Sequence, residues 1–145
     1  MLRSRSLQRL VLGSHRRAFR ALLLHLPPIR RVVIVGGGLF PRTALILREL
    51  LPGAQMVVMD SNAQHVETAR AWMRGVEFVN ERFVAGELCP CDLLVIPLSF
   101  QGDREAAYRN PSAKAVMVHD WIWRPRGRSR VVSVLLVKRL NLIAT

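Results

Sequence analysis

Three consecutive glycines, Gly36, Gly37 and Gly38, follow an apolar run at residues 32–35, and Asp60 stands 24 residues after Gly36. Because glycine has no side chain, a ligand can approach its backbone closely, and the first turn of a following helix offers free N–H groups. A carboxylate at the end of the next strand can accept hydrogen bonds from both hydroxyls of a ribose. This combination is typical of a nucleotide-binding site. The alternative is a glycine turn followed by an ordinary surface aspartate.

Few other side chains have the type and spacing for chemistry. His119 and Asp120 end a predicted strand, where ligands bind in open α/β sheets, and they are the two candidates for a general base. We expect His119 to be a structural residue hydrogen-bonded at the strand end, and Tyr108 to pack within a helix. Cys89 and Cys91 have no second cysteine pair and no suitably spaced histidines, so no metal site is predicted.

The elements that must position these side chains alternate between strands and helices. Strands buried in a parallel sheet have continuous apolar sequences, which predict strands at 32–35, 55–60, 76–79, 92–97, 115–119 and 131–137. Helices are expected after Pro41, after Ser61 and after Asp103. Ser61 followed by Gln64 has the spacing of a capping box, and Asp103 is a favourable N-cap.

The direction of the last strand follows from the length of its connection. Residues 120–130 contain Pro125 and Gly127 and have no helical periodicity, so they cannot form a crossover helix. Parallel neighbours need such a crossover, and the strand at 131–137 should therefore run antiparallel to the strand at 115–119. The predicted fold is a Rossmann-like, doubly wound α/β sheet, mostly parallel with an antiparallel end strand.

The N-terminal segment is basic and predicted to be helical. Its leucines recur at helical spacing until Pro27 and Pro28 end the pattern. The segment also has the composition of a mitochondrial targeting peptide. The preferred interpretation is instead an amphipathic helix that packs beside the first strand. We expect a basic helical segment at 1–28 and a Rossmann-like domain at 29–145.

The net charge of +12 is concentrated at the two ends of the chain. Residues 1–31 carry eight basic side chains and no acid, and residues 121–145 carry six and no acid. Residues 32–120 carry eight basic and ten acidic side chains, a net charge of −2. Basic segments can attract nucleic acid or anionic lipid, but a solvated face is the commoner outcome.

The strongest candidate for a nucleic-acid surface is Trp121 and Trp123 beside the arginines at positions 124, 126, 128 and 130. A lid over the site, or a solvated hairpin edge, is the preferred interpretation of these residues. Apolar runs such as 21–24 and 32–35 are far too short to cross a bilayer, so no membrane span is expected. Two cysteines one residue apart form no disulfide framework, which favours a reducing, cytoplasmic setting.

The glycine turn departs from the dinucleotide-binding pattern. That pattern requires G-x-G-x-x-G, and here Gly36 and Gly38 are followed by Pro41 in the third position. A proline ring stands where glycine would allow close packing of helix on strand. The departure argues against an NAD-binding site.

The sequence resembles a known superfamily over roughly residues 20–145. The segment Val33-Ile34-Val35-Gly36-Gly37-Gly38, then Asp60 with Ala69-Arg70, then Cys91-Asp92-Leu93-Leu94-Val95, is similar to class I S-adenosylmethionine-dependent methyltransferases. The glycine turn through Thr43 also resembles the G-x-G-P-x-P-x-T turn of nicotianamine synthases, with Leu39 where that family has proline.

The resemblance implies S-adenosylmethionine as the cofactor. It assigns the methionine part to the glycine loop, the ribose to the acid closing the second strand, and the adenine to the loop after the third strand. The implied cofactor-binding residues are Gly36, Gly37, Gly38, Thr43, Asp60, Ser61, Asn80 and Pro97.

Two departures leave the reaction open. Val35 stands where many methyltransferases have an acid for the methionine amine, and residues 97–100 are not the Asp/Asn-Pro-Pro-aromatic motif of amine methylation. We expect a methyltransferase with an unidentified acceptor, a small molecule rather than nucleic acid, and a homo-oligomer is an open option. The alternatives are a non-catalytic S-adenosylmethionine-binding or basic interaction module and, third, an NAD-binding oxidoreductase.

Overall fold

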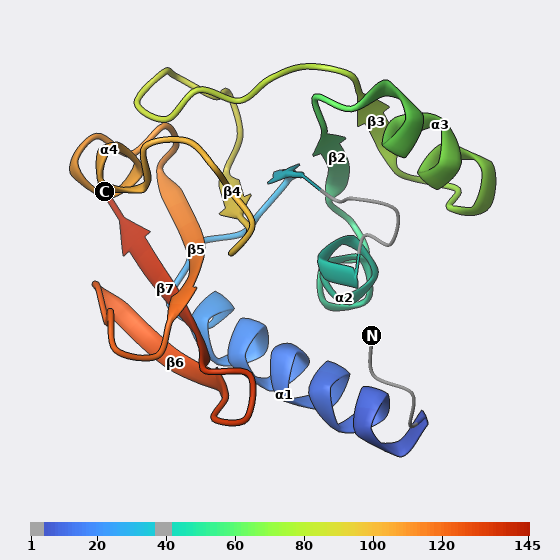
Figure 1. The fold of residues 1–145 in the computed structure, drawn as a ribbon. Helices are drawn as coiled ribbons and strands as arrows, with labels where there is room; N and C mark the ends of the chain where they lie inside the picture. The colour runs from blue at the N-terminus through green and yellow to red at the C-terminus, as the bar shows by residue number, and fades with distance from the viewer. Residues whose placement is uncertain (1–4, 37–41) are drawn as a thin grey trace.

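The computed structural model describes residues 5–36 and 42–145 (Figure 1). Within these residues a seven-stranded sheet has the order β3-β2-β1-β4-β5-β7-β6. The strands are β1 (Arg31–Val35), β2 (Gln55–Met59), β3 (Glu77–Val79), β4 (Leu93–Ile96), β5 (Ala115–Trp121), β6 (Arg128–Ser133) and β7 (Lys138–Ala144). The helices are α1 (Arg5–Leu23), α2 (Arg42–Leu50), α3 (Ala63–Trp72) and α4 (Arg104–Arg109).

The parallel strands form the centre of the molecule. β1 pairs with β2 on one side and β4 on the other, and β5 continues the parallel sheet beyond β4. Along β1, Val32 and Ile34 belong to one hydrophobic cluster, and Val33 and Val35 belong to the cluster on the opposite face. Burial on both faces explains the continuous apolar sequence, and the α/β fold class is confirmed.

The two faces of the sheet are covered differently (Figure 1). Residues of α1, α2 and α3 contribute to one cluster, in which Phe19 and Leu22 of α1 are almost completely buried. The other cluster contains Tyr108 of α4 and, around its margin, Phe83 and Phe100 from loops. α1 packs chiefly on β6 and α2, so the N-terminal helix is part of the core. The proposed boundary at residue 28 remains a prediction.

The predicted last strand at 131–137 is wrong. Its first residues belong to β6, its last residues form a turn, and β7 follows at Lys138–Ala144. β7 is antiparallel to both β5 and β6, so β6 is parallel to β5 but is not its neighbour. The argument for an antiparallel strand next to β5 therefore holds, but that strand is the seventh.

The connection at 122–127 carries the chain from the end of β5 past β7 to β6. Arg128 pairs with Leu142, which lies opposite Met117, so the connection returns from the end of β5 toward its middle. Gly127 has a φ of +57°, and a Cβ at this position would lie 2.2 Å from the carbonyl oxygen of Leu142. The short connection thus requires glycine where it passes the backbone of β7.

The variant Gly127→Ala is expected to destabilise the protein by at least about 2 kcal/mol, because left-handed strain and a backbone clash add together. Gly75→Ala is the matched control, since Gly75 has a φ of +77° and open space around its Cβ position. Urea unfolding of the two variants checks the difference. Equal losses of stability would contradict the proposed clash.

Candidate functional site

A cleft of about 720 Å³ lies at the carboxyl edge of the parallel strands. It opens where β1 ends, between the loops that follow β2 and β4. Connections from β1 and β4 leave in opposite directions at such a position, which is where open α/β sheets bind ligands. The lining residues predicted from the sequence are Gly36, Thr43, Asp60, Ser61 and Pro97. Gly37 and Gly38 lie outside the described residues.

Gly36 directly follows β1 and lines the cleft. Its φ is +62°, its N–H donates to the carbonyl of Met59 at 2.6 Å, and an added Cβ would lie 3.6 Å from Cγ of Pro97. Glycine at this position therefore keeps the space between β1 and β4 open and permits the left-handed turn. Thr43, in the first turn of α2, lines the same cleft.

Asp60 follows β2 with its side chain 11% exposed. Its Oδ1 accepts a hydrogen bond from the Asn62 N–H at 2.9 Å, and its Oδ2 lies 3.4 Å from Nδ1 of His65. The amide of Asn80 donates to the Asp60 carbonyl at 3.0 Å. Asn80 thus holds the backbone of Asp60 in place. Both oxygens of an ionised carboxylate accept hydrogen bonds, which is the chemistry that ribose hydroxyls require.

The prediction that Ser61 caps α3 is wrong. Asn62 is the N-cap, and its side-chain oxygen accepts from the N–H groups of Gln64 and His65. Asp60 fixes Asn62 by accepting its backbone N–H, which is an Asx-type turn directly before the helix. Ser61 is left exposed at the cleft. The predicted N-cap Asp103 of α4 is confirmed, since it accepts from the N–H of Ala106 at 3.0 Å.

Arg104 organises the loop after β4, and no sequence pattern indicated it. Its guanidinium donates to the carbonyls of Leu98 at 2.9 Å and of Pro97 and Phe100 at 3.3 Å. It also donates to the carbonyl of His119 at 2.7 Å. One charged side chain therefore ties the loop on the far side of the cleft to the end of β5. Recognising it needs the fold, because its acceptors are backbone atoms.

Other cleft-lining residues were also missed. They come from the start of α2, from α3 and from the loops after β3 and β4: Arg42, Asn62, His65, Glu81, Arg82, Phe83, Ser99, Phe100, Gln101 and Gly102. Phe83 and Phe100 lie with their ring centroids 5.7 Å apart and give the cleft an aromatic wall. Loop residues of this kind carry no periodicity from which they could be predicted.

His119 is a buried structural residue, as expected. Its ring packs edge-on against Phe19 at 5.6 Å, and its Nδ1–H donates to the carbonyl of Ile96 at 3.3 Å. Burial is the largest cause that lowers the pKa of His119 to about 3, and the charges of Lys138 and His15 lower it further. His119 does not line the cleft in the described part of the chain.

Asp120, the second candidate base, is also part of the interior. It is fully buried, and its carboxylate accepts from the Tyr108 hydroxyl at 2.7 Å and from the Trp121 N–H at 2.8 Å. Asn141 donates to the same hydroxyl at 2.9 Å. Tyr108 is buried in α4, as expected, and joins α4 to the end of β5.

The basic segment after β5 is partly neutralised by α4. Glu105 accepts hydrogen bonds from both Arg124 and Arg126. Trp121 and Trp123 are 41% and 65% exposed and stack on each other with ring centroids 5.5 Å apart. Two of the four arginines at positions 124, 126, 128 and 130 thus form an intramolecular contact with α4. No helix in the described residues has the length and apolar character needed to span a membrane.

No family model matches the sequence, and no curated protein matches it. Solved structures do share its fold. The plantazolicin methyltransferase BpumL in complex with a triazolic desmethylPZN analog and SAH is 15% identical, with a TM-score of 0.58 over 77% of this chain and 47% of that chain. A mutant of MtNAS, a nicotianamine synthase, is 16% identical, with a TM-score of 0.66 over 87% of this chain and 57% of that chain.

YjhP from E. coli is 17% identical, with a TM-score of 0.51 over 74% of this chain and 50% of that chain. The chain thus spans about half the length of the solved proteins it matches. The chain has the fold of class I S-adenosylmethionine-dependent methyltransferases, and the resemblance seen in the sequence is confirmed at the level of the fold. The sequence of the glycine turn resembles that of nicotianamine synthases, and the match to MtNAS shows that the fold is similar as well.

The buried histidines predict a loss of stability in mild acid. Burial lowers the pKa of His119 to about 3 and also lowers the pKa of His15, so both are neutral in the folded protein near pH 7. The unfolded chain takes up protons near pH 6.5, so the stabilisation is complete above that pH and declines as the pH falls toward 3. His119 alone should contribute a decrease of about 2 kcal/mol in the free energy of unfolding between pH 7 and pH 5.

Urea unfolding at both pH values checks this prediction. His119→Asn keeps a donor for the Ile96 carbonyl but does not titrate, so its unfolding free energy should vary less with pH than that of the wild type. The same dependence in the wild type and in His119→Asn would contradict the assignment.

Proposed function

We propose that the cleft at the carboxyl edge binds S-adenosylmethionine and that the protein is a methyltransferase acting on a small-molecule acceptor. The observation that carries the proposal is the junction at the end of β1. There Gly36, Asp60 and Pro97 line one cleft, in a fold that is similar to that of solved methyltransferases. Several of those structures are described as complexes with SAH.

The residues of the cleft fit the parts of the cofactor. A Cβ at Gly36 would occupy space beside Pro97, and its absence suits the close approach of a methionine chain. Asp60 presents a carboxylate that can accept hydrogen bonds from ribose hydroxyls. Phe83 and Phe100 offer apolar surface for an adenine ring. The volume of about 720 Å³ falls within the range of ordinary ligand sites.

Methyl transfer from S-adenosylmethionine requires little acid–base catalysis by the protein. Bound S-adenosylmethionine supplies an electrophilic methyl group on a sulfonium, whose departure as a neutral thioether needs no proton. The protein's task is to align the acceptor and exclude water. The burial of His119 and Asp120 away from the cleft is therefore compatible with methyl transfer. Arg104 would contribute by fixing the loop at 97–100 beside the bound cofactor.

A small-molecule acceptor is supported by the shape and charge of the site. The cleft is a pocket of about 720 Å³ bounded by the loops after β2, β3 and β4, whereas single-stranded nucleic acid is usually bound along a basic groove lined with stacking aromatic rings. Arg124 and Arg126, from the most basic segment, are bound to Glu105 and do not line the cleft. Arg42 and Arg82 do line it, but Asp60 and Glu81 line it as well, so its charge is not that of a basic groove.

Asp60→Asn is expected to weaken the binding of S-adenosylhomocysteine by roughly ten- to a hundredfold, because a hydrogen bond to a charged group typically contributes about 1.5–3 kcal/mol. Isothermal titration calorimetry measures the effect. The control is Glu67→Gln, which removes one negative charge from α3 at a position outside the cleft. Its affinity for S-adenosylhomocysteine should equal that of the wild type. An unchanged affinity in folded Asp60→Asn would remove Asp60 from the site.

Gly36→Ala should have an at least tenfold lower affinity for S-adenosylhomocysteine, because the added methyl group takes up space in the cleft next to Pro97. Gly75→Ala carries comparable backbone strain, since Gly75 also has a positive φ, but lies in open space. Both variants should lose about 1–2 kcal/mol of stability, and only Gly36→Ala should lose affinity. Normal binding by Gly36→Ala would show that the turn has no role in the site.

A further inference from the structure

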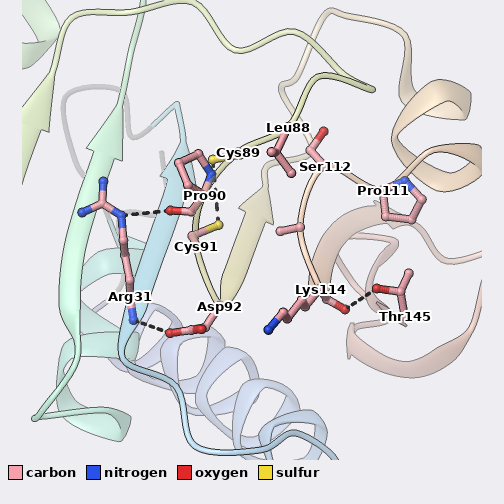
Figure 2. Close-up of a pocket in the computed structure, with 11 residues that line it drawn as sticks. Arg31, Leu88, Cys89, Pro90, Cys91, Asp92, Pro111, Ser112, Lys114 and Thr145 are labelled. Atoms are coloured by element: carbon pink, nitrogen blue, oxygen red, sulfur yellow. Dashed lines mark hydrogen bonds between the residues drawn. The ribbon is translucent and has the colours of Figure 1, made fainter.

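A second cleft, of about 560 Å³, lies at the opposite edge of the sheet, where the parallel strands begin (Figure 2). It is lined by the start of β1, by the segment leading into β4 and by the segment leading into β5. Cys89 and Cys91 line it, together with the cationic side chains of Arg31 and Lys114. These are the two cysteines of the chain, and the proposed cofactor site makes no use of them.

The two thiols face each other. Their sulfur atoms are 3.8 Å apart, with the Cys91 thiol donating to the Cys89 sulfur (Figure 2). Cys89 is 8% exposed and Cys91 is half-buried. A disulfide has a sulfur–sulfur distance of about 2.05 Å, so the two sulfurs need to approach by roughly 1.7 Å to form the bond. The pair is therefore close enough for the disulfide to be tested as a direct product of the two thiols.

The backbone around the thiols is held in place on both sides. The Cys89 N–H donates to the Ser112 carbonyl at 2.8 Å, and Nε of Arg31 donates to the Pro90 carbonyl at 3.2 Å. The carboxylate of Asp92 accepts from the backbone N–H of Arg31 at 2.9 Å. The segment is thus a fixed platform for the two thiols rather than a loose loop.

A metal site explains the pair less well. No group of three or more histidine, cysteine or acidic side chains within the described ranges could hold a metal ion. Asp92 is already engaged by backbone N–H groups, and two such bonds lower the pKa of its carboxyl group. Arg31 and Lys114 at the cleft also repel a cation. The arrangement favours thiolate chemistry instead.

The surroundings stabilise a thiolate on Cys89. The hydrogen bond from Cys91 is the largest influence and, with the nearby charge of Arg31, lowers the pKa of Cys89 to about 7, although burial opposes this. The same hydrogen bond raises the pKa of Cys91. One sulfur is thus prepared as a nucleophile near neutral pH, and the other holds its proton until the first has reacted.

We propose that Cys89 and Cys91 form a redox-active dithiol, in which Cys89 attacks low-molecular-weight disulfides and Cys91 resolves the mixed disulfide. The Cys89 thiolate forms a bond to one sulfur of R–S–S–R and releases RS⁻, which takes up a proton. Cys91 then gives its proton to the second departing RS⁻ as its sulfur bonds to Cys89. Two thiols are oxidised to one protein disulfide, and one external disulfide is reduced to two RSH.

The test uses the full chain with glutathione disulfide as the probe. Reduced protein is mixed with glutathione buffers of increasing disulfide content at pH 7, quenched with acid and examined by intact mass spectrometry. We expect a monomer lighter by two hydrogens and without added glutathione. Protein that remains a dithiol, or that forms only intermolecular dimers, would overturn the proposal.

Single-cysteine variants separate the two roles. Cys91→Ser should accumulate a glutathione adduct on Cys89, whereas Cys89→Ser should form its adduct severalfold more slowly at pH 7. Iodoacetamide alkylation of Cys91→Ser should level off at lower pH in the folded protein than in urea. Equal adduct rates in the two variants, or the same pH profile folded and unfolded, would show two independent thiols and refute the assignment.

Two cationic residues of the same cleft provide a matched pair of variants. Arg31→Gln removes the charge that lowers the pKa of Cys89 and should slow the exchange severalfold. Lys114→Gln removes an equal charge from the same cleft and should leave the rate unchanged. A slowed exchange in both variants, or in neither, contradicts the role given to Arg31.

The exchange is independent of the proposed methyltransferase function. It is measured without S-adenosylhomocysteine and at the other edge of the sheet. Asp60→Asn should therefore lose affinity for S-adenosylhomocysteine and keep the exchange, so failure of either proposal is recognised separately.

Discussion

The buried amide of Asn141 is the interaction on which the C-terminal half of the fold depends. Its nitrogen donates to the Tyr108 hydroxyl and to the Arg124 carbonyl, both at 2.9 Å, and its oxygen accepts from the Ser129 hydroxyl at 2.6 Å. One side chain of β7 thereby joins α4, the connection after β5, and β6. An unpaired buried amide is costly, so these partners must assemble together. β7 is fixed between β5 and β6 as a result.

This constraint reaches the candidate cofactor site through α4. The Tyr108 hydroxyl that Asn141 holds also binds Asp120 at the end of β5, and Arg104, one turn earlier in α4, holds the loop after β4. Through α4, the buried polar groups of β5 and β7 are thus connected to the loop that forms one wall of the cleft. The buried positions of Asp120 and Tyr108 make them supports of the site. The reacting groups of the proposed function are a cofactor and an acceptor, and the protein supplies their alignment.

The sequence predicted the parallel strands because strands buried on both faces have an unmistakable apolar sequence. The error at 131–137 has the same origin. Val134 and Leu135 belong to a turn and are 76% and 72% exposed, yet they continue an apolar run with no glycine, proline or asparagine to mark the turn. Val137 even adopts a φ of +55°, a conformation that its β-branched side chain gives no reason to expect.

Of the predicted cofactor-binding residues, three that directly follow a strand line the cleft, whereas contacts that depend on backbone positions were not predicted. Gly36, Asp60 and Pro97 were recognisable because each directly follows a buried strand, at the edge where such strands end. Arg104 binds only carbonyl groups, and its partners are set by the path of the chain after β4 and β5. Asn62 displaced Ser61 as the N-cap because Asp60 fixes the backbone N–H of Asn62. Such choices between adjacent polar residues are decided by local geometry that the residue types leave open.

The fold brings the two basic segments of the chain together. The two basic segments, which sequence analysis treated as separate ends, lie against each other because α1 packs on β6. Exposed charges on these elements repel, but salt at physiological strength screens them beyond about 8 Å. Phe19 and Leu22 of α1 are almost completely buried in the core, and each contributes roughly 1.5–3 kcal/mol by leaving water. Apolar burial therefore outweighs the repulsion, and the contact places His15 beside Lys138, where burial holds the pKa of both groups below their usual values. Apolar packing of α1 on β6 thus tolerates the like charge of the two basic segments.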